Sequence, residues 1–230
     1  MIKEKISIIG SAASIIGGVV ALLTSSTAIF FVAVLLFIVV VCYVYIIEQK
    51  SPYEYCLLFN EIVVEILDEK GEEAIHKYAS KIKILKNNAF YYKEAYSADG
   101  EIVNPKTNIG VIEEVKTEAG QYKYRTTLGE KRKKGEIINR EFEFVALNAF
   151  QKEEEYFYHK QRHLGNVVKI TIIFPLKRNP KDFWVEKHIG HYITDSQFQA
   201  RPIFINKKSA IELTIPQIEI NESYFIRWRW

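Results

Sequence analysis

An uncharged run, residues 6–47, constrains this chain more than any other feature, because nearly every charged side chain lies after it. Within this run, residues 28–47 are apolar without interruption. At 1.5 Å rise per residue, such a helix spans about 30 Å, the thickness of a bilayer's hydrocarbon core. Tyr43 and Tyr45 lie near its end, where amphipathic rings favour the membrane interface. The sequence therefore predicts a transmembrane helix over 28–47.

A second transmembrane helix is predicted over residues 6–23, which differ in composition from the longer run. On a helical wheel, small residues occupy about half of the circumference, and large aliphatic residues occupy the other half. Small faces let helix backbones approach closely in lipid. This face either packs against other helices or lines a polar path in an oligomer, and the sequence leaves both interpretations open. Its candidate residues are Ser7, Gly10, Ser11, Ser14, Gly17 and Gly18.

The short uncharged link 24–27 joins the two spans into a hairpin over residues 1–50. Lys3, Lys5 and Lys50 flank the open end of this hairpin, whereas the link carries no positive charge. The positive-inside bias then places both termini in the cytoplasm, and we expect a multi-pass protein of the cell inner membrane. A cleaved signal peptide is disfavoured because no clear A-x-A site separates the two runs.

The remainder of the chain has the period of two that is typical of strands. Residues 51–60 are expected to be a linker, and residues 61–230 a single β-rich, ligand-sensing domain in the cytoplasm. About ten strand-like runs follow without convincing helical periodicity, which predicts an antiparallel β-sandwich, with a barrel as the alternative. The last strand is the clearest, since its large residues at alternating positions are expected to anchor the core. Those residues are Tyr224, Ile226, Trp228 and Trp230.

Motifs for catalysis are missing: the sequence has no glycine-rich phosphate loop, no nucleophile elbow and no HExxH helix. The histidine pairs His159/His163 and His188/His191 have no cysteine nearby in sequence, so surface histidines are the default interpretation. Two cysteines cannot build a disulfide framework or a zinc site. We therefore expect a protein that is not an enzyme and needs no metal or cofactor.

Basic residues gather in three places, although the formal net charge is only +3, so any anion binding must be local. Phosphates, anionic headgroups or a polyanion would suit them, whereas the simpler interpretation is a solvated loop that keeps a sheet edge soluble. If these groups converge beside Tyr122, Tyr124 or Phe225, nucleobases could stack there. The candidate ligand-binding residues are Lys123, Arg125, Lys131, Arg132, Lys133, Lys134, Lys177, Arg178, Arg227 and Arg229.

A membrane hairpin followed by a strand-rich domain resembles the two-span, β-rich membrane effectors of bacterial anti-phage systems, as in CBASS and Hailong systems. The resemblance covers the layout of the whole chain and rests on no diagnostic motif, so no residue role is carried over. It implies a nucleotide signal made by a partner nucleotidyltransferase and sensed by the membrane protein.

Together these features predict a homo-oligomeric effector in the lipid bilayer that forms a pore or channel in anti-phage defence. A nucleotide or oligonucleotide bound to the β-rich domain would gate it, by favouring one state over the other. The alternative is a membrane-tethered, non-enzymatic β-sandwich scaffold that recruits a protein partner. A membrane-tethered enzyme is disfavoured by the missing catalytic constellation.

Overall fold

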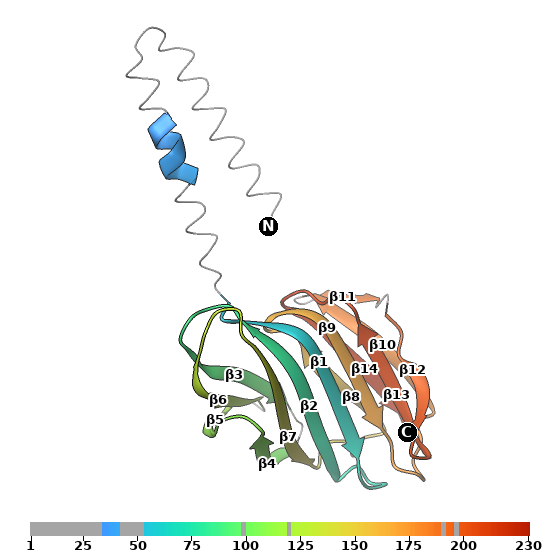
Figure 1. Ribbon diagram of the computed structural model, residues 1–230. Helices are drawn as coiled ribbons and strands as arrows, with labels where there is room; N and C mark the ends of the chain where they lie inside the picture. Colours follow the sequence, from blue (N-terminus) through green and yellow to red (C-terminus); the bar gives the residue numbers. More distant parts are fainter. Residues whose placement is uncertain (1–33, 42–52, 98–99, 119–120, 190–191, 196–197) are drawn as a thin grey trace. The chain divides into compact units, whose positions relative to one another are not determined.

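The computed structural model describes residues 34–41, 53–97, 100–118, 121–189, 192–195 and 198–230. The chain divides into two compact units, Met1–Pro52 and Tyr53–Trp230 (Figure 1).

In the first unit, the described residues are a single helical segment, 34–41. Within the described residues, no helix combines the length and the apolar character that crossing a bilayer demands. This finding contradicts the predicted transmembrane hairpin, and with it the multi-pass inner-membrane location and the ion-channel class.

Most of the predicted hairpin lies outside the described residues. This holds for all of the span over 6–23 and for the span over 28–47 except 34–41. The small-residue face lies there too: Ser7, Gly10, Ser11, Ser14, Gly17 and Gly18.

The second unit is mainly β, and its described residues form fourteen strands. Period-two sequences build the longest of them: in β2 and β7, buried and solvent-facing residues alternate along most of the strand. The expected linker over 51–60 is wrong from Tyr55 onward, where β1 begins. The strands are β1 (Tyr55–Ile66), β2 (Glu73–Ile84), β3 (Ala89–Ser97), β4 (Glu101–Thr107), β5 (Ile112–Glu118), β6 (Gln121–Arg132), β7 (Ile137–Leu147), β8 (Glu154–Lys160), β9 (Leu164–Ile173), β10 (Asp182–Ile189), β11 (Tyr192–Asp195), β12 (Arg201–Ile205), β13 (Lys208–Ile215) and β14 (Glu222–Arg229).

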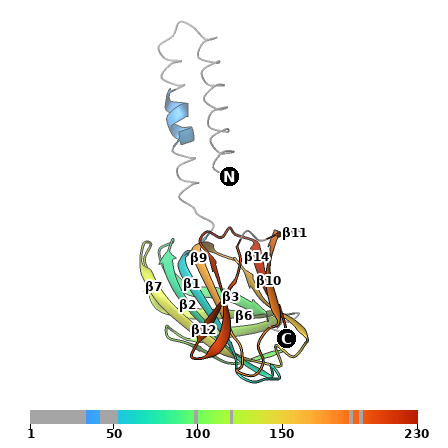
Figure 2. The ribbon, with the colours of Figure 1, turned by 90° about the vertical axis from the view of Figure 1, so that its right-hand side faces the viewer.

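Three sheets make up this unit. A seven-stranded sheet has the order β12-β13-β9-β1-β2-β7-β4, a four-stranded sheet the order β11-β10-β14-β8, and a three-stranded sheet the order β3-β6-β5 (Figures 1 and 2). The expectation of purely antiparallel pairing is wrong at the centre of the large sheet, where β1 and β9 run parallel. Parallel neighbours need a long connection, and here all of β2 to β8 lies between them in sequence.

Side chains from the two smaller sheets pack on one face of the large sheet. From the four-stranded sheet, Phe157 of β8 contacts the His76 ring of β2, with centroids 6.0 Å apart. From the three-stranded sheet, Tyr92 of β3 contacts Tyr55 of β1 at 5.2 Å. The predicted inward residues of β14 are confirmed, since all four are buried.

The apolar core is divided into two clusters by a row of buried polar residues on the large sheet. Asn60 of β1 pairs with Ser80 of β2, which in turn pairs with Arg140 of β7. All three are buried, and Ser80 Oγ donates a hydrogen bond of 2.8 Å to Asn60 Oδ1. One cluster contains Ile62, Tyr78 and Phe142, and the other contains Leu57, Ile82 and Ile138. Polar side chains at inward strand positions need partners, and this row marks where to look for a site.

Candidate functional site

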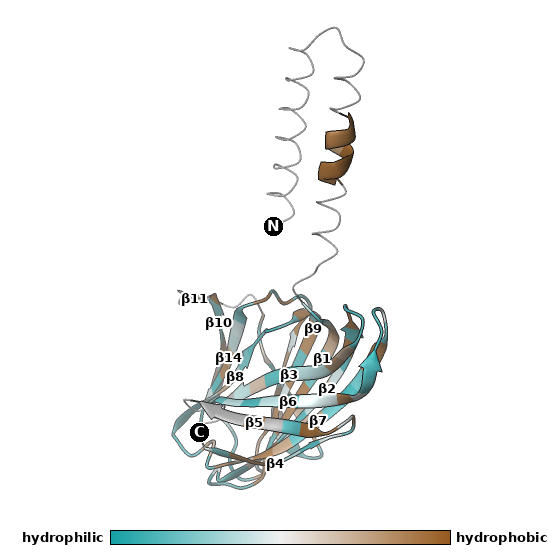
Figure 3. Ribbon diagram, turned by 90° about the vertical axis from the view of Figure 1, so that its left-hand side faces the viewer, coloured by the Kyte–Doolittle hydropathy of each residue, from teal (hydrophilic) through white to brown (hydrophobic). Residues whose placement is uncertain are grey.

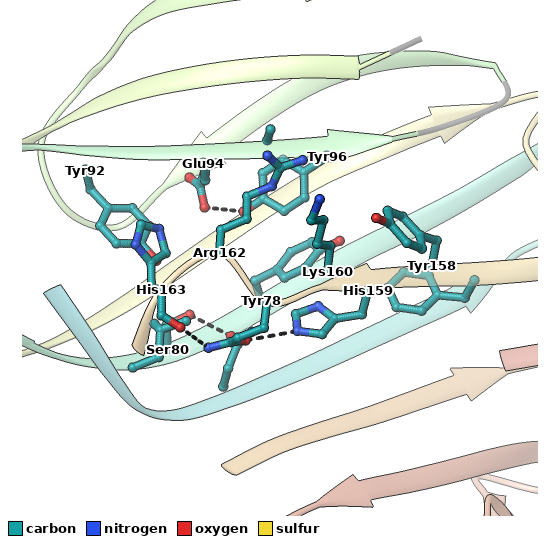
Figure 4. A pocket seen from close by; sticks show the side chains of 15 residues that line it. Tyr78, Ser80, Tyr92, Glu94, Tyr96, Tyr158, His159, Lys160, Arg162 and His163 are labelled. Atoms are coloured by element: carbon teal, nitrogen blue, oxygen red, sulfur yellow. Dashed lines mark hydrogen bonds between the residues drawn. The ribbon is translucent and has the colours of Figure 1, made fainter. Parts of the chain in front are cut away.

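A small cavity lies above this polar row, where β8 of the four-stranded sheet and β3 of the three-stranded sheet approach each other (Figure 4). We call it the seam cavity. Its volume is about 80 Å³, and Asn60, Ser80 and Tyr78 of the large sheet line it from below. The connection between β8 and β9, residues 161–163, forms another wall.

Glu94 of β3 and Arg140 of β7 form a buried ion pair beside this cavity. The Arg140 guanidinium donates two hydrogen bonds to the carboxylate, with Nη1 3.0 Å from Oε2 and Nη2 bonded to Oε1. The Tyr96 hydroxyl donates a further bond to Oε2. Burial raises the pKa of the Glu94 carboxyl, against the opposing effect of Arg140. Burial acts to lower the pKa of Arg140, but the Glu94 carboxylate, with Tyr96 and Tyr92, acts to raise it. The net pKa lies above its ordinary value, so the guanidinium stays charged.

Gln161 holds the β8–β9 connection in place. It is buried, and its Nε2 donates a hydrogen bond of 2.6 Å to the His163 carbonyl. Its Oε1 lies 3.4 Å from His159 Nε2. A Cβ atom at Gly165 would overlap Gln161 Nε2, so glycine at that position permits the close approach.

Two histidines adjoin the cavity, and burial keeps both neutral near pH 7. It lowers the pKa of His159 to about 4, and it also lowers the pKa of His163. His163 Nε2 lies 3.2 Å from the Lys93 carbonyl oxygen. Because that oxygen can only accept, the proton of the neutral ring must be on Nε2. The bond ties the β8–β9 connection to β3.

A larger cavity of about 500 Å³ adjoins the seam cavity and is lined by β3, β6 and the β8–β9 connection. We call it the outer chamber. Strands β3 and β6 lie side by side in the three-stranded sheet (Figure 3). The two cavities share Glu94, Ala95, Arg162 and His163 in their walls. Four cationic side chains line the outer chamber: Lys93, Lys123, Arg125 and Arg162.

Strand pairing brings these cations together. Lys93 pairs with Arg125, and Ala95 pairs with Lys123, so these residues share one face of the β3–β6 ladder. Arg125 Nε lies 3.7 Å from Glu113 Oε2. Within the part of the chain that the structure describes, no carboxylate lies within ion-pair distance of Lys93 or Arg162. The chamber is therefore electropositive, with Glu94 already engaged by Arg140.

Of the residues predicted to bind a ligand, Lys123 and Arg125 line the outer chamber. Residues 131–134 lie farther along β6 and in the turn before β7, where Arg132 is paired with Glu130 at 3.0 Å. The structure thus places Lys123, Arg125, Lys131 and Arg132 on β6 and Lys133 and Lys134 in the turn that follows, and of these Lys123 and Arg125 line the outer chamber. Ligand binding at these positions stays a prediction.

The other predicted residues lie elsewhere. In the β9–β10 connection, Lys177 lies 3.7 Å from Glu69, and the Arg178 guanidinium lies 3.9 Å from the Trp230 ring centroid. On β14, Arg227 and Arg229 form ion pairs with carboxylates of β8 and β10. The basic groups therefore do not all converge on one sheet face.

Sequence reasoning missed Lys93, Glu94, Arg140 and Arg162. Arg140 had a signal: it stands at an inward position of β7 between Ile138 and Phe142, where a charge requires a buried partner. Lys93 and Arg162 had none, since their roles follow from strand pairing and from the path of a connection.

The histidine pairs do not form a metal site in the described residues, where no group of three His, Cys, Asp or Glu side chains could hold an ion. His159 and His163 line the seam cavity. His188 packs on the Phe225 ring, with centroids 4.3 Å apart. His191 lies outside the described residues.

No protein-family model matches this chain, and no curated protein matches it. Among solved structures, a proposed protease from Parabacteroides distasonis is 9% identical, with a TM-score of 0.48, over 77% of this chain and 40% of that one. An M1 zinc metallopeptidase from Deinococcus radiodurans is 6% identical, with a TM-score of 0.43, over 76% of this chain and 42% of that one. This chain thus spans about two fifths of the length of those proteins. Likeness at this level identifies neither a family nor an activity.

Proposed function

We propose that the second unit, Tyr53–Trp230, is a binding module for a phosphorylated ligand of the nucleotide or oligonucleotide class, and that the ligand occupies the outer chamber. The observation that carries this proposal is the gathering of Lys93, Lys123, Arg125 and Arg162 around one cavity. Among the residues that the structure describes, the other charged side chain in its lining is Glu94.

The chemistry of these cations favours phosphate. Guanidinium groups bind phosphate oxygens with two parallel hydrogen bonds, and lysines add point charges. The Glu94 carboxylate, which lies in the wall, forms an ion pair with Arg140 that offsets its negative charge. An incoming anion therefore meets little repulsion and gains contacts with cations of two elements, the β3–β6 ladder and the β8–β9 connection.

The chamber is also held in shape before a ligand arrives. The Glu94–Arg140 pair fixes β3 to the large sheet, and Gln161 fixes the connection that carries Arg162. A site built on fixed elements loses less conformational entropy when it binds.

Three further expectations from the sequence remain proposals. They are a homo-oligomeric state, a partner nucleotidyltransferase that supplies the ligand, and a role in anti-phage defence. The outer chamber supports only the ligand class on which they depend.

The experiment is a titration of fluorescently labelled ATP and of a labelled single-stranded oligonucleotide with the purified full-length chain, followed by anisotropy. Arg162→Ala and Lys93→Ala are each expected to lower the affinity about fivefold to tenfold, as loss of one charged hydrogen bond does. Lys81→Ala is the matched control, because it removes one charge from an exposed site on β2. If all three variants bind the probes as tightly as the unaltered protein does, the outer chamber is excluded as the binding site.

A protein-docking module is the second candidate, and edge strands β11 and β12 favour it. Tyr192 and Phe204 are 79% and 80% exposed there, which is unusual for large apolar side chains. A pure docking module predicts no affinity for either labelled probe, so the same titration separates the two functions.

A further inference from the structure

Two aromatic rings stand on the three-stranded sheet without joining the core. Phe90 and Tyr91 of β3 are half-buried, and their ring centroids lie 4.9 Å apart at an interplanar angle of 80°. Neither ring belongs to the apolar clusters beneath the sheet or packs against them. Each ring keeps part of its surface exposed to solvent.

Cationic side chains lie on both sides of this aromatic pair. On one side, the Arg125 guanidinium lies 5.0 Å from the Tyr91 ring centroid, beside Lys93 and the outer chamber. On the other side, Ala89 pairs with Arg132, next to the end of β6 and the β6–β7 turn. The exposed lysines there are Lys131, Lys133 and Lys134.

The lysines of the turn differ from the arginine among them. Arg132 is occupied by Glu130 and Glu136, with N–O distances of 3.0 and 3.9 Å, and by the Leu128 carbonyl. In the described part of the chain, no carboxylate lies within ion-pair distance of the side chains of Lys131, Lys133 or Lys134. The turn itself is well formed, since the Lys134 backbone N–H donates a bond of 2.9 Å to Asn87 Oδ1.

We infer that the β3–β6 ladder binds an extended single-stranded nucleic acid, with phosphates at the outer chamber and at the β6–β7 turn and with unpaired bases on Phe90 and Tyr91. This inference rests on the proposed function, because the outer chamber is one end of the track. An aromatic pair with cations on both sides suits a strand whose bases stack on the rings while its flanking phosphates meet the cations.

The length of the track sets the size of the ligand. On β3, six residues separate Ala95, the partner of Lys123, from Ala89, the partner of Arg132; at about 3.3 Å per residue the track is roughly 20 Å long. A mononucleotide is too short to reach both ends. A duplex has its bases stacked and paired, so it offers the rings no free base face.

The experiment compares a labelled dinucleotide with a labelled single strand of about ten nucleotides, using the full-length chain at several salt concentrations. The longer strand is expected to bind at least tenfold more tightly. Replacing Lys131, Lys133 and Lys134 with Ala is expected to lower only the affinity of the longer strand and to flatten its salt dependence by about two units of slope. The matched control replaces Lys77, Lys81 and Lys83 of β2 and removes the same charge.

The aromatic contact has its own variants. Tyr91→Ala is expected to weaken binding of the longer strand by roughly fivefold to a hundredfold, whereas Tyr91→Phe keeps the affinity because stacking needs the ring and not the hydroxyl. Thermal melting of each variant shows whether the fold is kept.

Three results would overturn the inference. In the first, dinucleotide and longer strand bind equally and the lysine variant changes neither, which leaves the outer chamber as a nucleotide site and removes the track. In the second, a duplex of the same sequence binds as well as the single strand, which removes the stacking. In the third, neither probe binds the unaltered protein, and the proposed function fails with the inference.

Discussion

The Glu94 carboxylate on β3 and the Arg140 guanidinium on β7 are paired in the interior, with Arg140 Nη1 3.0 Å from Glu94 Oε2. Arg140 is 1% exposed and lies against two rings, 5.0 Å from the Tyr92 centroid and 4.7 Å from the Phe142 centroid. The pair joins the three-stranded sheet to the large sheet at the wall shared by the two cavities.

Removal of one partner is expected to be costly, because it leaves the other as an unpaired buried charge. Arg140→Met should destabilise the protein by about 3–5 kcal/mol, and Glu94→Gln should also be strongly destabilising. The double variant should cost less than the sum of the two single changes. Urea unfolding followed by circular dichroism measures all three, and additive losses would show that the two side chains do not depend on each other.

Stability should fall in acid because His76 of β2 is buried among aromatic rings. Its ring stacks on Phe144 with centroids 4.7 Å apart, and within the described residues neither ring nitrogen has a hydrogen-bond partner. Burial lowers the pKa of His76 to about 3 from an ordinary value of 6.5. As the pH falls, His76 of the unfolded chain is therefore protonated before His76 of the folded protein. The contribution of neutral His76 to the free energy of unfolding is complete above about pH 6.5 and is lost as the pH falls toward 3.

His76→Phe tests this directly, since phenylalanine keeps the ring and removes the titration. Between pH 7 and about pH 4.5, the wild-type protein should lose about 2–3 kcal/mol more than the variant. His159, whose pKa burial lowers to about 4, leaves an acid loss of similar size in both proteins, which cancels in the comparison. Equal pH profiles for wild type and variant would contradict the role of His76.

Gly165→Ala is expected to disturb the candidate site through Gln161. The added methyl group would overlap Gln161 Nε2 and force that side chain from the His163 carbonyl. We expect a loss of about 1–3 kcal/mol in stability and a weaker affinity for the labelled probes. Adding Gln161→Ala should relieve the overlap but not recover the affinity. If Gly165→Ala alone binds the probes normally, the hydrogen bond from Gln161 to the His163 carbonyl does not position Arg162.

Strand positions could be predicted where hydrophobic alternation is regular. In β2 and β7 this alternation continues along most of the strand, so both can be recognised from the sequence. The sequence does not reveal the start of β1 at Tyr55, because Pro52 and the polar residues 48–51 before it favour a linker. The parallel pairing of β1 with β9 had no local signal, since nothing near either strand encodes a partner about a hundred residues away.

The same distinction applies to the site. Lys123 and Arg125 could be selected because they lie near a basic run in the sequence. Lys93 joins them only through its pairing with Arg125, and Arg162 joins them only because Gln161 and His163 tie its connection to the fold. Arg227 and Arg229 show the opposite error, because carboxylates on adjacent strands occupy guanidinium groups that look available in the sequence.

Lysine footprinting tests the outer chamber most directly. The full-length chain is acetylated briefly, with and without a saturating single-stranded oligonucleotide, and each lysine is quantified by mass spectrometry. Lys177 and Lys81, exposed and outside the chamber, serve as references in the same sample. The outer-chamber site predicts slower acetylation of Lys93 and Lys123 with ligand and no change at the two references. Protection at the references, or none at Lys93 and Lys123, would contradict it.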